Sequence, residues 1–188
     1  MRRWFPDDIH WRAPTARRLR VLDTLGTEAT FLEAEFYALH VGKIVEGIAS
    51  AAARVAEEGG GPSVDLGTRE ADKILANLQA KGMLVLPKAE DIGKSDQPGF
   101  AVMISGAPSR DLEVIELKEA YRASAEILRC PNPESMDPKQ LGDVLANLRS
   151  CAGRLRGWLW NHAMFFQDDA LIVQMGMLGT DSFYGKTP

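Results

Sequence analysis

The sequence predicts a mainly α-helical protein, a helical bundle of three long helices plus shorter ones, with a small two-stranded β-hairpin after a short amphipathic helix. Three observations support this fold class. Apolar residues recur every three or four positions over long stretches, capping residues precede several of those stretches, and two short apolar runs follow a glycine that can stop a helix. At 188 residues the chain is long enough to bury one sizeable core, so we expect a single domain over residues 1–188.

The first residues predict an arm followed by a short helix. Prolines break residues 1–14, and the two tryptophans of this N-terminal arm, Trp4 and Trp11, are expected to pack onto the domain or onto a partner subunit. Thr15 can cap a short helix that ends at Gly26.

A long helix is predicted from Thr30 to about Glu58. Thr30 and Glu33 form the pattern of a capping box, and apolar residues then follow on two sides of the helix. A helix that is apolar on two sides is central in a bundle, and its many alanines let neighbouring helices approach closely. The GGGP stretch at 59–62 ends it and forms a hinge.

Residues 63–105 predict an appendage made of a helix and a β-hairpin. The helix, 69–81, has an apolar side and a polar side, and Gly82 stops it. The run MLVLP (83–87) is expected to form one strand, a polar loop to follow, and FAVMI (100–104) to form the second strand. Helix, strand, loop, strand is also how a winged-helix module ends, with the polar side of the helix facing DNA.

Two further helices and a tail complete the prediction. A helix over about 111–129 places Val114, Leu117, Tyr121 and Leu128 on one stripe. Asp137 caps the next helix, whose regular apolar spacing runs on through His162 and Phe165. The run DDALIVQMGMLG (168–179) is predicted to be one more short helix, and residues 178–188 a polar, mobile tail.

Composition narrows the class of protein. A hydrophobic content of 45%, a charged content of 26% and a net charge of −4 are ordinary for a globular protein. The most apolar long stretch, 36–56, contains charged residues, which argues against a membrane span. Cys130 and Cys151 make neither a disulfide framework nor a CxxC pair, so we expect a reduced, cytoplasmic protein. Residues 1–20 hold six arginines against two aspartates, a basic patch that suits a phosphate-bearing or acidic partner as well as a solvated face.

The sequence offers no motif for catalysis. Gly93-Lys94-Ser95 resembles the end of a phosphate-binding loop, but position 88 is lysine where that loop requires glycine. His40 lacks the carboxylate three residues earlier that bundle metal sites use, because position 37 is tyrosine. Nucleophile motifs are absent from the sequence as well. We therefore predict no catalytic residue, no metal and no cofactor, and favour a protein that is not an enzyme.

Three functions remain open. The favoured one is a non-catalytic α-helical interaction or adaptor protein that self-associates, as a homodimer, through helix faces. Its predicted contact residues are the aromatic and methionine side chains Trp4, Trp11, Trp158, Trp160, Met164 and Phe166.

The first alternative is a winged-helix-like DNA-binding transcriptional regulator that uses residues 68–104. Its candidate contacts are Arg69, Lys73, Asn77, Lys81, Lys88 and Lys94. Over 63–105, however, five basic residues meet six acids, whereas DNA-facing modules are normally more basic.

The second alternative is a small-molecule or metal-binding enzyme with a pocket in the bundle core. Its candidate residues are Tyr37, His40, His162 and Asp168. His162 has a simpler interpretation too, as a core histidine that bonds a carbonyl or hydroxyl group.

Overall fold

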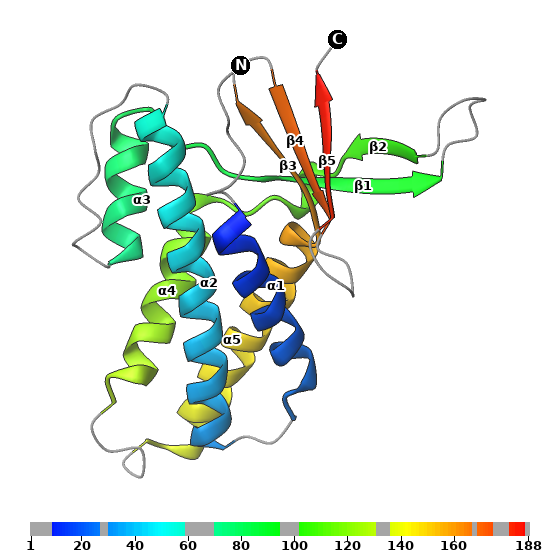
Figure 1. The fold of residues 1–188 in the computed structure, drawn as a ribbon. Helices are drawn as coiled ribbons and strands as arrows, with labels where there is room; N and C mark the ends of the chain where they lie inside the picture. Colours follow the sequence, from blue (N-terminus) through cyan, green and yellow to red (C-terminus); the bar gives the residue numbers. More distant parts are fainter. Residues whose placement is uncertain are drawn as a thin grey trace. The chain divides into compact units, whose positions relative to one another are not determined.

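A computed structural model of the chain describes residues 9–26, 30–58, 70–94, 102–130, 136–166, 169–174 and 181–186. Within these ranges there are five α-helices, and the first four pack against one another, so the predicted mainly helical class is confirmed (Figure 1). In chain order the elements are α1 (Ile9–Thr24), α2 (Phe31–Glu58), α3 (Ala71–Ala80), β1 (Lys88–Lys94), β2 (Val102–Gly106), the 3₁₀ turn η1 (Pro108–Arg110), α4 (Val114–Leu128), α5 (Pro138–Leu159), β3 (Asn161–Phe166), β4 (Asp169–Gln174) and β5 (Asp181–Lys186).

The chain divides into two compact units. The first, the helical unit, comprises Met1–Leu84 and Glu113–Gly153, and the second, the sheet unit, comprises Val85–Leu112 and Arg154–Pro188. The single domain over 1–188, the arm at 1–14, the appendage at 63–105 and the tail at 178–188 stay predictions. None of the helices in the described ranges is long and apolar enough to cross a membrane.

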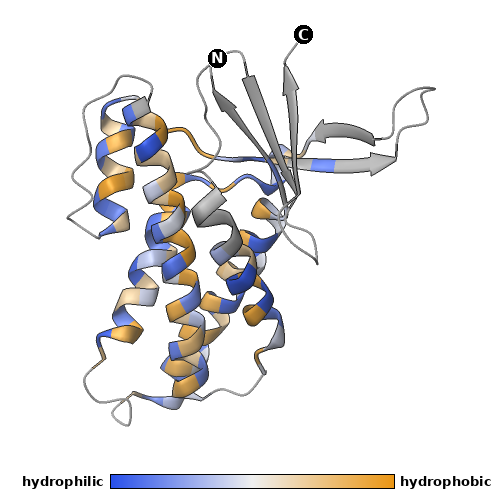
Figure 2. Cartoon of the chain, viewed as in Figure 1, coloured by the Kyte–Doolittle hydropathy of each residue, from blue (hydrophilic) through white to orange (hydrophobic). Residues whose placement is uncertain are grey.

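Helix α2 is the centre of the helical unit. Helices α1, α3 and α4 each pack against it, and α3 also packs against α4. Small residues allow this close packing: a Cβ atom added at Gly42 would lie 3.4 Å from Cβ of Ser124 on α4. Figure 2 shows hydrophobic and hydrophilic positions alternating along these helices, as expected where one side of each helix is buried. The most deeply buried α2 side chains are those of Ala34, Ala38, Val41, Ile44, Val45, Ile48, Ala49, Ala52 and Ala53.

Local caps explain where the helices begin and end. The Thr30 hydroxyl accepts the backbone N–H of Glu33 at 3.2 Å, and the Asp137 carboxylate accepts that of Lys139 at 2.8 Å, so these two predicted N-caps are confirmed. The third prediction, Thr15, is wrong, because α1 begins at Ile9 and Thr15 lies inside it. Gly82 has φ of 65°, and Met83 N donates to Leu78 O at 2.9 Å, which together make the expected glycine stop after α3.

Helix α4 has a capping box that the sequence analysis missed. The Glu113 backbone N–H donates to the Glu116 carboxylate at 2.7 Å, and the Glu113 side chain accepts the N–H of Glu116 in return. The buried stripe of α4 also differs from the predicted one. It runs through Leu117, Ala120, Ser124 and Ile127, whereas Leu128, predicted to be on the stripe, is 46% exposed.

The sheet unit contains a five-stranded antiparallel sheet in the order β2-β1-β3-β4-β5. Strand β1 pairs with β2 from Glu90↔Gly106 to Lys94↔Val102, and with β3 at Lys88↔Ala163 and Ala89↔His162. These two strands are antiparallel neighbours in a larger sheet, and the predicted small two-stranded hairpin is not shown as a separate element. The link between β1 and β2, residues 95–101, lies outside the described residues.

The first predicted strand was placed too early. Residues 83–87 form no strand, and β1 instead covers 88–94, which the sequence analysis assigned to a polar loop. Pro87 has no N–H to donate to a ladder, and this explains why pairing starts just after it.

The end of the chain was assigned to helices incorrectly. Helix α5 stops at Leu159, and His162 and Phe165 lie on strand β3; residues 169–174, predicted to be helical, form β4. Short apolar runs fit a helix or a strand equally well, and pairing with neighbouring strands decides the outcome here. At the other end α1 begins at Ile9, inside the predicted irregular arm, and continues through Pro14.

Candidate interaction surface

Helix α2 presents a row of apolar side chains to solvent. Leu32 is 62% exposed, Phe36 43% and Leu39 39%. Their spacing of four and then three residues places all three on one side of the helix, away from the buried stripe. The row lies at the N-terminal end of α2. At this level of the helix the buried side chains of Ala34, Tyr37 and Ala38 fill the core of the helical unit.

The same side of α2 becomes polar further along the helix. At 100° per residue it continues through positions 43, 46, 47, 50, 54 and 57, which are Lys43, Glu46, Gly47, Ser50, Arg54 and Glu57. One side of one helix is thus apolar only in its first third. The exposed side of α2 is polar over its remaining length, as expected for a surface that faces water. Exposure to water alone therefore does not explain why the first third of this side is apolar.

Two neighbouring helices each place one exposed apolar side chain level with the row. On α1, the Arg18 guanidinium lies 3.5 Å from the ring of His40, and Leu22 O accepts the Tyr37 hydroxyl at 3.5 Å, so Val21 stands level with about residue 38 of α2. Val21 is 38% exposed.

On the other flank of α2, helix α4 runs antiparallel to it (Figure 1). Since Ser124 faces Gly42, Leu128 is also level with about residue 38. We call Val21, Leu32, Phe36, Leu39 and Leu128 the apolar band.

The apolar band holds five of the six large hydrophobic residues that are exposed in the described ranges. The sixth, Ile115, begins α4 and is 50% exposed. It is nine residues from Ser124, so it stands level with about residue 51 of α2, roughly 18 Å from Leu39 along the helix. Scattered single apolar residues on a surface need no explanation, whereas a group of them makes this surface a candidate for binding.

A buried ion pair fixes the start of α2 beneath the band. Arg149 on α5 lies with Nη2 3.1 Å from Oε1 of Glu33 and donates to Gly26 O at 3.3 Å. Its guanidinium carbon is 5.7 Å from the centroid of the Tyr37 ring. The Glu33 side chain is only 9% exposed. One side chain therefore ties together α5, the start of α2 and the segment after α1.

The predicted partner-binding residues fall in several places. Trp158 is fully buried and donates its Nε1 to Pro87 O at 3.1 Å within the sheet unit. Trp160 is half-buried, and the Arg156 guanidinium lies over its ring at 5.1 Å. Trp4 and the side chains of Trp11, Met164 and Phe166 lie outside the described residues. Their role in binding a partner stays a prediction.

The predicted DNA-facing residues are exposed where the structure describes them. Lys73, Asn77 and Lys81 occupy the outer side of α3, opposite its four buried apolar residues. Lys73 forms an ion pair with Glu70, and the hydrogen bond and charge of Glu70 raise the pKa of Lys73. Lys88 forms an ion pair with Asp111 at 3.2 Å. Neighbouring acids thus offset two of these charges, while Arg69 and the Lys94 side chain lie outside the described residues.

The proposed pocket residues belong to different units. Tyr37 and His40 are on α2 of the helical unit. Burial first, and the charge of Arg18 second, lower the pKa of His40. His162 is fully buried in the sheet unit, with Nδ1 3.0 Å from Leu159 O. Asp168 lies outside the described residues, and among those that are described no group of three metal-ligating side chains comes together.

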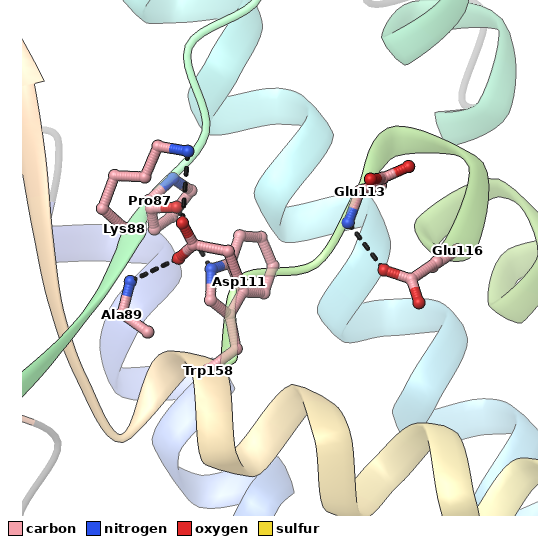
Figure 3. A network of polar contacts seen from close by, with 7 residues as sticks. All are labelled: Pro87, Lys88, Ala89, Asp111, Glu113, Glu116 and Trp158. Carbon is pink, nitrogen blue, oxygen red and sulfur yellow. Dashed lines mark hydrogen bonds and ion pairs between the residues drawn. The ribbon is translucent and has the colours of Figure 1, made fainter. Parts of the chain in front are cut away.

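A polar network holds β1 within the sheet unit (Figure 3). One carboxylate oxygen of Asp111 accepts the backbone N–H of Ala89 at 2.7 Å, and the other lies 3.2 Å from Lys88 Nζ. Ala89 O in turn accepts the N–H of Ala107 at 2.8 Å. The Trp158 side chain also donates to Pro87 O, just before β1. These contacts hold Pro87, Lys88 and Ala89 in place, so we assign the network the role of stabilising the start of β1.

Comparisons with protein-family models, with curated proteins and with solved structures each gave no match for this chain. The candidate site therefore depends on the geometry of the helical unit. The sequence analysis missed the apolar band, because Leu32, Phe36 and Leu39 lie outside both apolar sides that it assigned to this helix. Their spacing of i, i+4 and i+7 was the available signal.

Proposed function

We propose that this chain is a non-catalytic α-helical interaction protein that associates with a second copy of itself through the apolar band. The observation that carries the proposal is the gathering of five exposed apolar side chains at one level of the helical unit, over three helices. The core beneath them has its own buried residues, so the band is not needed to fill it. This proposal moves the contact surface from the aromatic residues near the C-terminal end of α5 to the outer side of α2.

The size of the band suits a moderate affinity. The exposed part of Phe36 corresponds to about 90 Å², and burying it would contribute about 2 kcal/mol per copy. The three α2 residues together offer on the order of 250 Å² per copy, an apolar centre that polar surroundings must extend to reach a stable interface. A dissociation constant in the micromolar range is therefore expected.

Sedimentation velocity over a range of concentrations tests the proposal. The wild-type chain is expected to shift from monomer to dimer as concentration rises. Phe36→Glu places a charge at the centre of the band and removes about 2 kcal/mol on each of the two copies, so it is expected to weaken the dimer by on the order of a thousandfold. Ile115→Glu is the matched control, since it also replaces an exposed apolar residue by glutamate but far from the band.

The control variant is expected to dimerise as the wild type does. Circular dichroism must show that both variants keep their helices, because an unfolded variant would say nothing about the surface. Equal weakening by Phe36→Glu and Ile115→Glu would count against a role for the band.

A further inference from the structure

We infer that the two copies meet antiparallel, α2 against α2, with the two-fold axis at the level of residues 37–38. This inference rests on the proposed function and specifies how its surface is used. It follows from the positions of the apolar residues and of two charged residues, Glu35 and Lys43, that flank the row.

Symmetry limits how a single patch can bind itself. In a two-fold dimer each residue meets its counterpart or exchanges partners with another residue of the same patch. Val21 and Leu128, on opposite flanks of α2, both stand level with about residue 38. An axis at that level that reverses the helix direction places each of them level with its own copy. It also places Phe36 level with Leu39 of the second copy, on both halves of the interface.

Charge decides between antiparallel and parallel pairing. Glu35 is partly exposed near the start of the row, and Lys43 is exposed just beyond its end. A parallel pair would set Glu35 level only with Glu35 and Lys43 level only with Lys43, so neither charge would meet an opposite one. The antiparallel pair places Lys43 level with residue 32 of the second copy, about 4.5 Å along the helix from its Glu35. The long lysine side chain can span that distance, so two identical ion pairs form.

The position of the Lys43 ammonium agrees with this pairing. Nζ lies 2.6 Å from Oε2 of Glu46, which holds it toward one edge of the exposed side of α2. At 100° per residue Glu35 and Glu46 are on that same edge, within about 20° of each other. The reversing two-fold axis keeps each edge facing its own counterpart. Lys43 of one copy therefore points toward the edge that carries Glu35 of the other.

A charge-exchange series tests the orientation. The dissociation constant is measured by sedimentation equilibrium for the wild type, Glu35→Lys, Lys43→Glu and the double variant Glu35→Lys/Lys43→Glu. Each single variant turns two attractions into two repulsions and is expected to weaken the dimer about tenfold. The double variant restores opposite charges and is expected to return to within about threefold of the wild type.

Glu46→Gln serves as the control. It removes the neighbour of Lys43 on its own helix and is expected to change the dissociation constant by no more than about twofold. Thermal melting shows whether each variant keeps the fold of the helical unit.

The outcomes separate this inference from the proposal beneath it. In a parallel pair position 35 is level only with position 35, and position 43 only with position 43, so neither single variant brings two new like charges of these positions together. Values within about threefold of the wild type for both single variants would therefore overturn the antiparallel orientation. A double variant as weak as the single ones would overturn it too. In both cases a dimer that Phe36→Glu still disrupts leaves the proposed function standing. A wild-type chain that stays monomeric overturns both.

Discussion

Removing the guanidinium of Arg149 tests how the helical unit is held together. Arg149→Met keeps much of the apolar stem of the side chain but leaves the Glu33 carboxylate, 9% exposed, without the cation 3.1 Å away. Breaking a buried ion pair by removing one partner costs about 3–5 kcal/mol. The Arg149 side chain is 30% exposed, and water weakens the ion pair. We therefore expect Arg149→Met to cost somewhat less than a fully buried pair would, about 2–3 kcal/mol of the free energy of unfolding.

The assay is urea unfolding followed by helical circular dichroism. The free energy of unfolding should fall by that amount, and the thermal midpoint by about 5–10 °C. Replacing both partners, as Glu33→Gln/Arg149→Met, removes the buried charge as well. We expect the double variant to be less destabilised than Arg149→Met alone, with a coupling energy of about 1–2 kcal/mol.

Lys73→Met is the control, since it breaks the exposed ion pair with Glu70 and should leave stability unchanged within error. The reasoning would be refuted if Arg149→Met were as stable as Lys73→Met. It would also be refuted if the two changes in Glu33→Gln/Arg149→Met simply added, because the ion pair would then contribute nothing of its own.

Three further predictions follow from the contacts described above. Asp111→Ala leaves the N–H of Ala89 without its 2.7 Å acceptor and should cost about 1–3 kcal/mol in urea unfolding, whereas Asp111→Asn keeps an acceptor oxygen and should cost less than half as much. Gly82→Ala should cost about 1 kcal/mol in the same assay, since φ is 65° and the space around the glycine is open; no loss would argue against the left-handed stop. His40 should titrate by NMR below its ordinary pKa of 6.5, and Arg18→Met should raise its pKa; a native pKa at or above 6.5 contradicts the account. Because the folded pKa is the lower one, this group contributes stability above pH 6.5 that is lost as the pH falls toward the folded pKa.

The helices with strong local signals could be predicted from the sequence. The cap at Thr30, the apolar sides of α2 and the glycine stop at Gly82 depend on neighbours a few residues away in the chain. The same holds for Asp137 at the start of α5. For such elements the local preference and the final packing agree.

The strands near the end of the chain could not be predicted in the same way. His162 and Phe165 continue the helical spacing of α5 by coincidence, while pairing of His162 with Ala89 and Val173 fixes them in a sheet. Ala89 is distant in sequence and Val173 lies on another strand, so the apolar spacing of the α5 region alone does not reveal them. The sequence also did not reveal which residues of α4 are buried. Turning the helix about its axis by the angle of one residue is enough to move Leu128 from the buried stripe to the surface.

The apolar band was hidden for a related reason. Whether a leucine on a long helix is core or surface depends on where the neighbouring helices lie. On sequence alone Leu32, Phe36 and Leu39 are three more apolar residues in an apolar helix. Only the packing of α1 and α4 on α2 shows that these three remain exposed and that Val21 and Leu128 join them.

Self-association through the apolar band is the central claim, and the mass of the wild-type chain in solution tests it most directly. Light scattering on the intact protein should give a mass that rises with concentration from that of one chain toward that of two, with the midpoint in the micromolar range. A mass that remains that of a single chain up to several hundred micromolar would contradict the claim.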